Sequence, residues 1–393
     1  MIGTVRFIFT HPVLRYMISH RIITRLAEGF VTGFGAIFIY TVSGEQLWVP
    51  MTVYTVAALG SALAMFWIDR VFNVLGTKTS IVTGVVLRIG LWVCLVLTTA
   101  GSWMYTLPLY ALCIIGIRFF YWPPYNNILT NGLDDTHRTQ GLAFLSNVAS
   151  GIGLFMPVVV GIIVSLYSFN LAFILGTILI CLSLIPVLKI PATKSVRYDW
   201  RAGDLWKHVR SKENRHYVWG LAAQGFENAF AGALWPIVIF ILLDGDFVSI
   251  GIIASLAGLG VIMLNTVTSR FADQMQNSAL FLRYSTVIKS IIWVLKAFAE
   301  TAMQVFFLRT FSSASSSVVT INQESVSFAQ AQKHQDLADE YVVLRDFSLN
   351  MGRVIGYTAI IISSLFVPIQ WLFALAAIAV LCINIITIPQ KNK

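Results

Sequence analysis

The chain has 393 residues, of which 57% are hydrophobic and only 11% are charged, and its mean hydropathy is +0.77. A soluble domain carries about 25% charged residues, so this chain lacks the polar surface that water requires. The net charge of +9 does not indicate nucleic-acid binding, because the bases lie in short segments between apolar runs. These runs are continuous rather than alternating, which favours a polytopic α-helical membrane protein over a barrel.

Twelve apolar segments are long enough to cross the hydrocarbon core, which takes about 20 helical residues. In chain order they are 20–42, 48–68, 79–99, 106–131, 140–166, 169–188, 216–243, 248–268, 279–298, 302–323, 341–365 and 369–388. No signal-peptide cleavage pattern precedes the first of them. The sequence predicts a first six-helix bundle (1–188), a cytoplasmic linker (189–215) and a second six-helix bundle (216–393).

Loop charges predict the orientation of these spans. If the N-terminus is cytoplasmic, the inner loops hold most bases, including eight lysines and arginines within 189–215. The outer side then holds a single base, Lys296, together with four acids, Glu45, Asp244, Asp246 and Glu300. Cytoplasmic loops carry an excess of Lys and Arg. We therefore expect both termini on the cytoplasmic side of a prokaryotic inner membrane.

Two tryptophans, Trp200 and Trp206, lie among the bases of the linker. Tryptophan and basic residues together are typical of a segment that lies on an anionic leaflet. An ordinary linker with positive-inside charge is the alternative. Membrane lipid is therefore an expected partner of the chain.

The two predicted bundles repeat each other in sequence. Ala27-Glu28-Gly29-Phe30 returns as Ala223-Gln224-Gly225-Phe226, 196 residues later. Three further sets recur in the same order: Arg88 and Trp92 as Lys289 and Trp293, Arg118 and Asn131 as Arg309 and Asn322, and Phe144, Asn147 and Gly153 as Phe347, Asn350 and Gly356. Because each unit has an even number of spans, the two units share one orientation and form a pseudo-symmetric pair.

Six spans, a linker and six further spans resemble the major facilitator superfamily over essentially the whole chain. Asp69-Arg70 and then Gly76-Thr77-Lys78, after the second span, are similar to the family signature Gly-x3-Asp-Arg-x-Gly-Arg-Lys. Met65 replaces the first glycine, and the spacing to Gly76 is longer. The resemblance implies that Asp69 and Arg70 form a conformational latch, and a plain loop turn is the alternative.

The fifth span contains Gly151, Gly153, Pro157 and Gly161. This pattern is similar to the glycine-proline motif of many proton-coupled exporters, although Met156 and Val160 replace two of its glycines. The resemblance gives only a weak indication of export. Generic close packing of helices, which small residues permit, is the alternative.

Polar side chains concentrate in the first, fourth, seventh and tenth spans, which line the central cavity of the resembled fold. A charge at the bilayer centre costs about 2.5–3.5 kcal/mol, so such charges face a cavity or a partner. The residues expected at the cavity are Arg25, Glu28, Arg118, Tyr121, Trp122, Asn126, Gln224, Glu227, Asn228, Arg309, Ser313 and Ser316. Ion pairs that hold the bundle together are the alternative.

Roles within this set follow from chemistry. Arg118 and Arg309 suit an anionic solute, because guanidinium groups bind carboxylate and phosphate, whereas the aromatic cluster 119–125 suits an amphipathic compound. Glu28 and Glu227 are the coupling candidates, as proton carriers or counter-charges. Arg88 and Lys289 are repeat-equivalent residues in spans that are peripheral in the resembled fold, so we expect them to form ion pairs or to snorkel rather than to contact substrate. The charges Arg345, Asp346 and Arg353 are expected to be structural, at the cytoplasmic gate.

The sequence predicts a secondary active transporter that moves a small solute by alternating access, coupled to a proton or counter-ion by symport or antiport. A lysolipid or amphiphile flippase-like transporter and an organic-anion exchanger are the alternatives. No nucleotide-binding loop, hydrolase motif or metal-ligand spacing occurs, so we expect no enzyme, cofactor or metal. We expect a monomer whose four cysteines are small buried hydrophobes.

Overall fold

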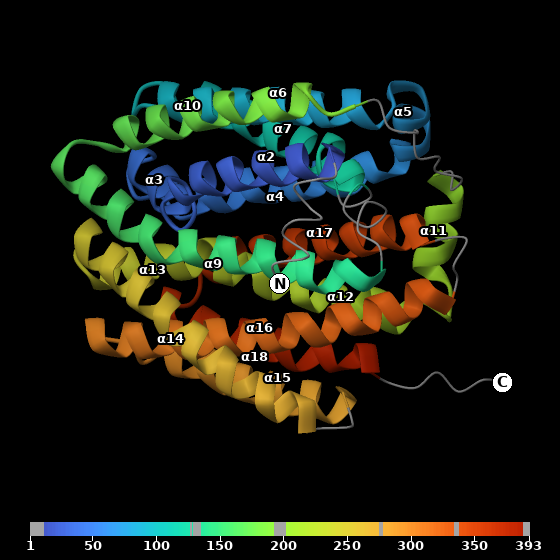
Figure 1. Cartoon of the computed structure of the whole chain (residues 1–393). Helices are drawn as coiled ribbons and strands as arrows, with labels where there is room; N and C mark the ends of the chain where they lie inside the picture. Colours follow the sequence, from blue (N-terminus) through green and yellow to red (C-terminus); the bar gives the residue numbers. More distant parts are fainter. Residues whose placement is uncertain are drawn as a thin grey trace.

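The structure is a computed structural model that describes residues 12–125, 128, 135–191, 202–274, 278–333 and 338–387. All regular elements within these ranges are helical. We refer to residues 12–191 as the first half and to residues 215–387 as the second half. Figure 1 shows the peripheral helices of the two halves on opposite sides of one bundle, with α9 and α17 running along its middle.

The helices of the first half overlap the first six predicted spans, and residues 126–127 and 129–131 of the fourth span lie outside the described residues. They are α2 (Pro12–Gly29), α3 (Phe34–Val42), α4 (Trp48–Ala64), η1 (Met65–Trp67), α5 (Ile68–Leu75), α6 (Thr77–Leu97), α7 (Trp103–Phe120), α9 (Asp135–Leu166) and α10 (Phe169–Leu188). The second span is longer than predicted, because α4, η1 and α5 continue one another to Leu75.

The helices of the second half coincide with the other six predicted spans. They are α12 (Arg215–Ala229), η2 (Phe230–Leu234), α13 (Trp235–Leu242), α14 (Phe247–Gln274), α15 (Ser278–Lys296), α16 (Ala302–Lys333), α17 (Ala338–Ser363), η4 (Ile369–Leu372), α18 (Phe373–Cys382) and η5 (Ile383–Thr387). Among the described residues, seven helical stretches are long and apolar enough to cross a membrane, or eight if α2 and α3 form one bent span.

The first span is bent by 43° between α2 and α3. Gly33 has φ 84° at the start of α3, a left-handed conformation that glycine adopts without steric cost. The hydroxyl and the backbone N–H of Thr32 both donate to the carbonyl of Glu28 at 2.8 Å. The bend therefore places the side chain of Glu28 in the last turn before a break in the helix.

The seventh span contains a wide turn instead of a sharp break. Residues Phe230–Leu234 form the π-helical turn η2, and Pro236 follows near the start of α13, where its missing N–H is tolerated. The span remains continuous from Arg215 to Leu242. Short π-helical turns often accompany functional sites, and this one begins three residues after Glu227.

The two halves touch closely where α9 crosses α14. A Cβ atom built on Gly251 would clash with the carbonyl oxygen of Pro157, and one built on Gly161 would clash with the carbonyl of Phe247. Gly151 and Gly153 have open space where a Cβ would stand. In the motif of the fifth span, Pro157 and Gly161 thus lie at a helix crossing, as the packing interpretation expects.

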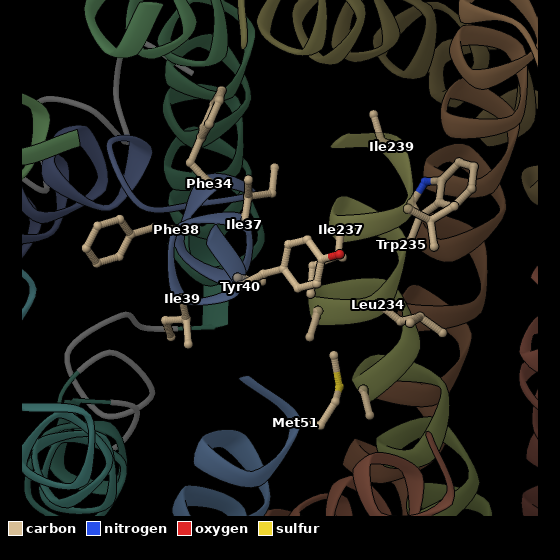
Figure 2. Packing of buried hydrophobic residues seen from close by; sticks show 14 of the residues in the cluster. Phe34, Ile37, Phe38, Ile39, Tyr40, Met51, Leu234, Trp235, Ile237 and Ile239 are labelled. Atoms are coloured by element: carbon tan, nitrogen blue, oxygen red, sulfur yellow. The ribbon is translucent and has the colours of Figure 1, made fainter. Parts of the chain in front are cut away.

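A buried apolar cluster joins the halves beside the loops 43–47 and 243–246. Figure 2 shows Ile37 and Tyr40 of α3 facing Ile237 of α13, and all three are at least 92% buried. Ring contacts extend the cluster, with 6.3 Å between the centroids of Tyr40 and Phe240. Burial of apolar area stabilises such a contact by about 25 cal/mol per Å². This end of the bundle is therefore closed.

The helix α11 (Ala202–Arg210) lies at the opposite end of the bundle, the same end as α5 (Figure 1). It contacts η1 of the first half and both α12 and α17 of the second. The ring of Trp206 lies 6.4 Å from that of Phe66, and the guanidinium of Arg210 lies 4.5 Å from the Trp206 ring. Trp200 is outside the described residues, and the membrane-surface interpretation of this segment stays a prediction.

Candidate functional site

The carboxylate of Glu28 is surrounded by three arginines. Its oxygens lie 3.2 Å from Arg21 Nη1, 3.3 Å from Arg25 Nη1 and 3.3 Å from Arg88 Nη1. The Glu28 side chain is 26% exposed and that of Arg25 is 45% exposed, whereas Arg21 and Arg88 are buried. One negative charge faces three positive charges, so the group as a whole attracts anions.

Aromatic rings hold the two buried arginines in place. The Arg88 guanidinium lies 4.4 Å from the Tyr121 ring centroid, and that of Arg21 lies 5.0 Å from Trp122. Cations are attracted to the faces of such rings. Tyr121 is itself fully buried, and its hydroxyl lies 3.1 Å from His20 Nε2. Tyr121 therefore supports Arg88 from behind.

A cavity of about 250 Å³ opens beside this cluster. All of its lining residues belong to the first half: the polar Glu28, Thr32, Arg88 and Arg118, the aromatic Trp92, Tyr110 and Trp122, and the aliphatic Val31, Leu91, Ile114 and Ile117. Arg88, expected from sequence to be a structural charge in a peripheral span, both pairs with Glu28 and lines the cavity. Its neighbours Trp92 and Tyr110 were not in the predicted set.

Arg118 connects this cavity to the second half. Its Nη1 donates to Asn350 Oδ1 at 2.9 Å, and Arg353 Nη1 donates to the same oxygen at 2.9 Å. Nearby, the rings of Tyr54 and Tyr357 stack across the halves at 5.6 Å. Asn350, which the sequence indicated only as a repeat position near the gate, thus joins two arginines from different halves.

The second half contains a comparable acid–base pair that is sealed. Lys289 Nζ donates to Glu227 Oε2 at 3.0 Å, and Trp293 Nε1 donates to Glu227 Oε1 at 3.1 Å. Glu227 is 2% exposed. Lys289 corresponds to Arg88 in the sequence repeat, so the contacts make Glu227, and not Gln224, the counterpart of Glu28.

Lys296 is the last residue of α15, yet its side chain turns into the protein. Its Nζ lies 3.5 Å from the Trp293 ring and 4.7 Å from the Trp235 ring, and it donates to Ser312 Oγ at 3.0 Å. The residue is 2% exposed. Lys296, the single base that the sequence places near the outer side, is therefore buried between two indole rings.

The structure distributes the other predicted residues over different places. Arg309 lines a cavity of about 10 Å³ with Pro157 and Pro236, and Thr32 lines both this cavity and the one at Arg118. Ser313 is exposed, and the side chains of Gln224, Asn228 and Ser316 are half-buried. Asn126 lies outside the described residues.

Asp69 and Arg70 lie in the first turn of α5, so the sequence-based placement of both residues in a loop is wrong. The chain leaves the helix only at Gly76, whose φ is 71°. Asp69 is half-buried and Arg70 is exposed. Their role as a conformational latch stays a prediction.

A bundle of apolar helices with charges buried between them defines an integral membrane protein. A profile of the Major Facilitator Superfamily matches residues 22–335, and the chain belongs to this family of transporters. No curated protein matches the sequence significantly.

Solved structures share this fold. The chain is similar to a POT family transporter in complex with 5-aminolevulinic acid, with a TM-score of 0.72 at 13% identity, over 95% of this chain and 94% of that one. It is also similar to a bacterial homologue of the iron transporter ferroportin in an inward-facing state, with a TM-score of 0.70 at 13% identity, over 94% and 96% of the two chains. At such identities the likeness concerns the fold alone.

Proposed function

We propose that the protein is a secondary active transporter that moves a small anionic solute by alternating access. The observation that carries the proposal is the cavity of about 250 Å³, into which Arg88 and Arg118 project with Glu28 as the acid. A site of positive charge in a low-dielectric wall attracts and retains anions. In this proposal the units 1–188 and 216–393 move against each other around the 189–215 linker.

The contact between Arg118 and Asn350 supports the alternating movement. A solute bound to Arg118 would be separated from the second half by a single side chain, because Asn350 accepts hydrogen bonds from both Arg118 and Arg353 through one oxygen. A bound anion that competes for Arg118 would weaken this bridge. Binding would then change the relative stability of the two arrangements, as a transport cycle requires.

Glu28 is the proposed proton carrier, in preference to Glu227. Glu28 is partly exposed and lines the cavity, whereas Glu227 is buried against Lys289 and Trp293. A group that takes up and releases protons in each cycle needs a path to water. The proposal therefore places coupling in the first half and a structural pair in the second.

Reconstituted vesicles with an imposed pH gradient test the proposal. A thermal-shift screen of small anions on purified protein selects the solute, since ligands that bind the native state raise its apparent stability. We expect the gradient to drive accumulation in the parent and not in Glu28→Gln. The control is the double variant Glu227→Gln/Lys289→Met, which removes the sealed pair and keeps coupling. Equal gradient-driven accumulation by the parent and Glu28→Gln contradicts proton coupling at Glu28.

The proposed location is a prokaryotic cytoplasmic membrane with both termini inside, and the proposed unit is a monomer. The excess of bases on one side of the predicted topology supports the orientation of the termini. Fusing a reporter that is active only in the cytoplasm to either terminus tests the orientation. An inactive reporter at both ends would reverse it.

A further inference from the structure

Arg88 is a buried cation whose hydrogen bonds are incomplete. The residue is 4% exposed, and its Nη1 has no hydrogen-bond partner among the described residues. The contact of this atom with Glu28 at 3.3 Å is an ion pair whose geometry is too poor for a hydrogen bond. A buried N–H without an acceptor costs about 1–3 kcal/mol. Arg88 is therefore ready to bind an acceptor that the protein does not supply.

The walls near Arg88 define the rest of the ligand. Around the charged end the cavity is lined by the rings of Trp92, Tyr110 and Trp122 and by aliphatic side chains. Pockets for drug-sized ligands measure about 300–1,000 Å³, and this cavity is smaller, at about 250 Å³. The cavity fits a molecule with one anionic group and a compact aromatic or apolar body.

Glu28 occupies the position that the anionic group of such a ligand would take. Its carboxylate faces Arg21 and Arg25 from its own helix and Arg88 from α6. The titratable neighbours are His20, Tyr121 and Tyr125. Both ring nitrogens of His20 have partners, because Nδ1 lies 2.8 Å from the Ser183 carbonyl and Nε2 lies 3.1 Å from the Tyr121 hydroxyl. Glu28 is thus the acid in direct contact with the arginines.

We infer that the cavity binds a small aromatic or apolar monocarboxylate whose carboxylate replaces that of Glu28 on Arg88, while Glu28 takes up one proton. Proton and anion then neutralise each other: the proton comes from water on the side of binding and returns to water when the anion leaves. The exchange predicts symport of one proton with one anion. The binding step stands without transport, whereas the symport step rests on the proposed function.

The test is binding of benzoate and phenylacetate to the purified full-length protein, followed by calorimetry in buffers of different ionisation enthalpy. We expect saturable binding with uptake of about one proton per ligand, so that affinity falls up to about tenfold per pH unit where Glu28 is ionised. Benzyl alcohol, which has the ring without the charge, is expected to bind at least tenfold more weakly.

Variants distinguish the role of the Glu28 carboxylate from that of the ligand carboxylate. Glu28→Gln is expected to bind benzoate at least as tightly as the parent and without pH dependence, because the amide no longer competes as an anion. Arg88→Gln is expected to lose at least tenfold in affinity, and Arg88→Lys serves if the first variant does not fold. Glu227→Gln/Lys289→Met, with its sealed pair removed, is expected to bind like the parent.

Several results would overturn the inference: no saturable binding of either carboxylate, an unchanged pH slope in Glu28→Gln, or full affinity in the Arg88 variants. Proton-linked binding without accumulation in vesicles keeps the site and refutes the transport proposal. Accumulation of another solute by a protein that binds neither carboxylate refutes the inference and leaves the transport proposal intact.

Discussion

The two halves contain the same kind of acid–base contact in opposite surroundings. In the first half, Glu28 meets Arg88 beside a cavity, with Arg21 and Arg25 as additional cations. In the second half, Glu227 meets Lys289 in a buried core, and the indole N–H of Trp293 donates to the second oxygen of the carboxylate. A duplicated pair thus stands beside a cavity in one copy and inside the packed interior in the other, so a repeat in sequence does not establish a repeat in function.

The basic residue differs between the two pairs, arginine in the first half and lysine in the second, and this fits their different surroundings. Arginine has a planar fork of five donors and can bind a ligand while it retains a partner, whereas lysine is a compact point charge. Arg88 retains an unsatisfied nitrogen, while Lys289 Nζ donates to its carboxylate at 3.0 Å. The first half therefore has donors to spare for a ligand, and the second uses its base to neutralise Glu227.

The largest expected effect comes from breaking the sealed pair. Lys289→Met leaves the Glu227 carboxylate buried with only the Trp293 N–H as partner, and we expect a loss of about 3–5 kcal/mol of stability. Thermal unfolding in detergent measures it. The double variant Glu227→Gln/Lys289→Met is expected to recover most of the loss, because no unpaired charge remains. A stable Lys289→Met protein would show that the second half is not sealed.

The crossing between the halves gives the next largest effect. Gly251→Ala places a Cβ against the Pro157 carbonyl, and we expect overpacking to cost about 1–3 kcal/mol and to slow transport. Gly258→Ala on the same helix is the matched control, because its nearest neighbour would be Leu154 Cδ1 at an ordinary 3.6 Å. Stability and transport rate are measured for both. Equal behaviour of the two variants contradicts the close crossing.

Arg88→Lys makes the first pair chemically like the second. Because a lysine cannot replace the fork of an arginine, we expect a loss of about tenfold in anion affinity, which corresponds to about 1.4 kcal/mol. Stability should change by less, since the positive charge beside Glu28 remains. Calorimetry and thermal unfolding of one preparation separate the two effects. A loss of stability without a loss of affinity would make the first pair structural as well.

The smallest effect concerns the turn before α14. Hydrogen bonds from the Ser249 hydroxyl and from the backbone N–H groups of Ser249 and Val248 lower the pKa of Asp246 below its ordinary value of 3.8. A lowered folded-state pKa stabilises the protein above the ordinary value, and the contribution is lost as pH falls through the folded-state pKa.

We expect Asp246→Ala to lower stability by about 1 kcal/mol at neutral pH, as the loss of a helix cap does. The difference from the parent should vanish in strong acid, where the carboxyl is protonated in both states. Thermal unfolding at neutral and acid pH measures it. Asp244→Asn in the same loop is the control, because asparagine tolerates the left-handed conformation of Asp244 (φ 48°), and an equal effect of Asp246→Ala and Asp244→Asn would refute the capping role.

Much of the fold follows from local patterns. Continuous apolar runs predict where helices lie, and described helices overlap the predicted spans, although residues 126–127 and 129–131 of the fourth span lie outside the described residues. The pattern failed where a helix continues into polar sequence, as at Asp69 and Arg70, because helix continuation depends on backbone geometry and not on polarity alone. It also missed the wide turn at Phe230–Leu234, since neighbouring helices determine how the chain accommodates Pro236.

The candidate site could be predicted from the sequence less completely than the fold. The sequence indicated Arg25, Glu28, Arg118 and Trp122, because charges and aromatic residues stand out in an apolar span. It assigned Arg88 to the periphery, since one charge in a span does not reveal which neighbour it faces. It also treated Arg118 and Arg309 as one pair, and in the structure they line two cavities that share Thr32.

By itself, the sequence determined the membrane class, the helical segments and the duplication, because these depend on composition and on order along the chain. Only the tertiary structure decided that Glu28 lies open among arginines while Glu227 is enclosed by Lys289 and Trp293. The physical reason is that burial and ion pairing between helices depend on tertiary contacts: Arg88 comes to Glu28 from α6, and Lys289 comes to Glu227 from α15.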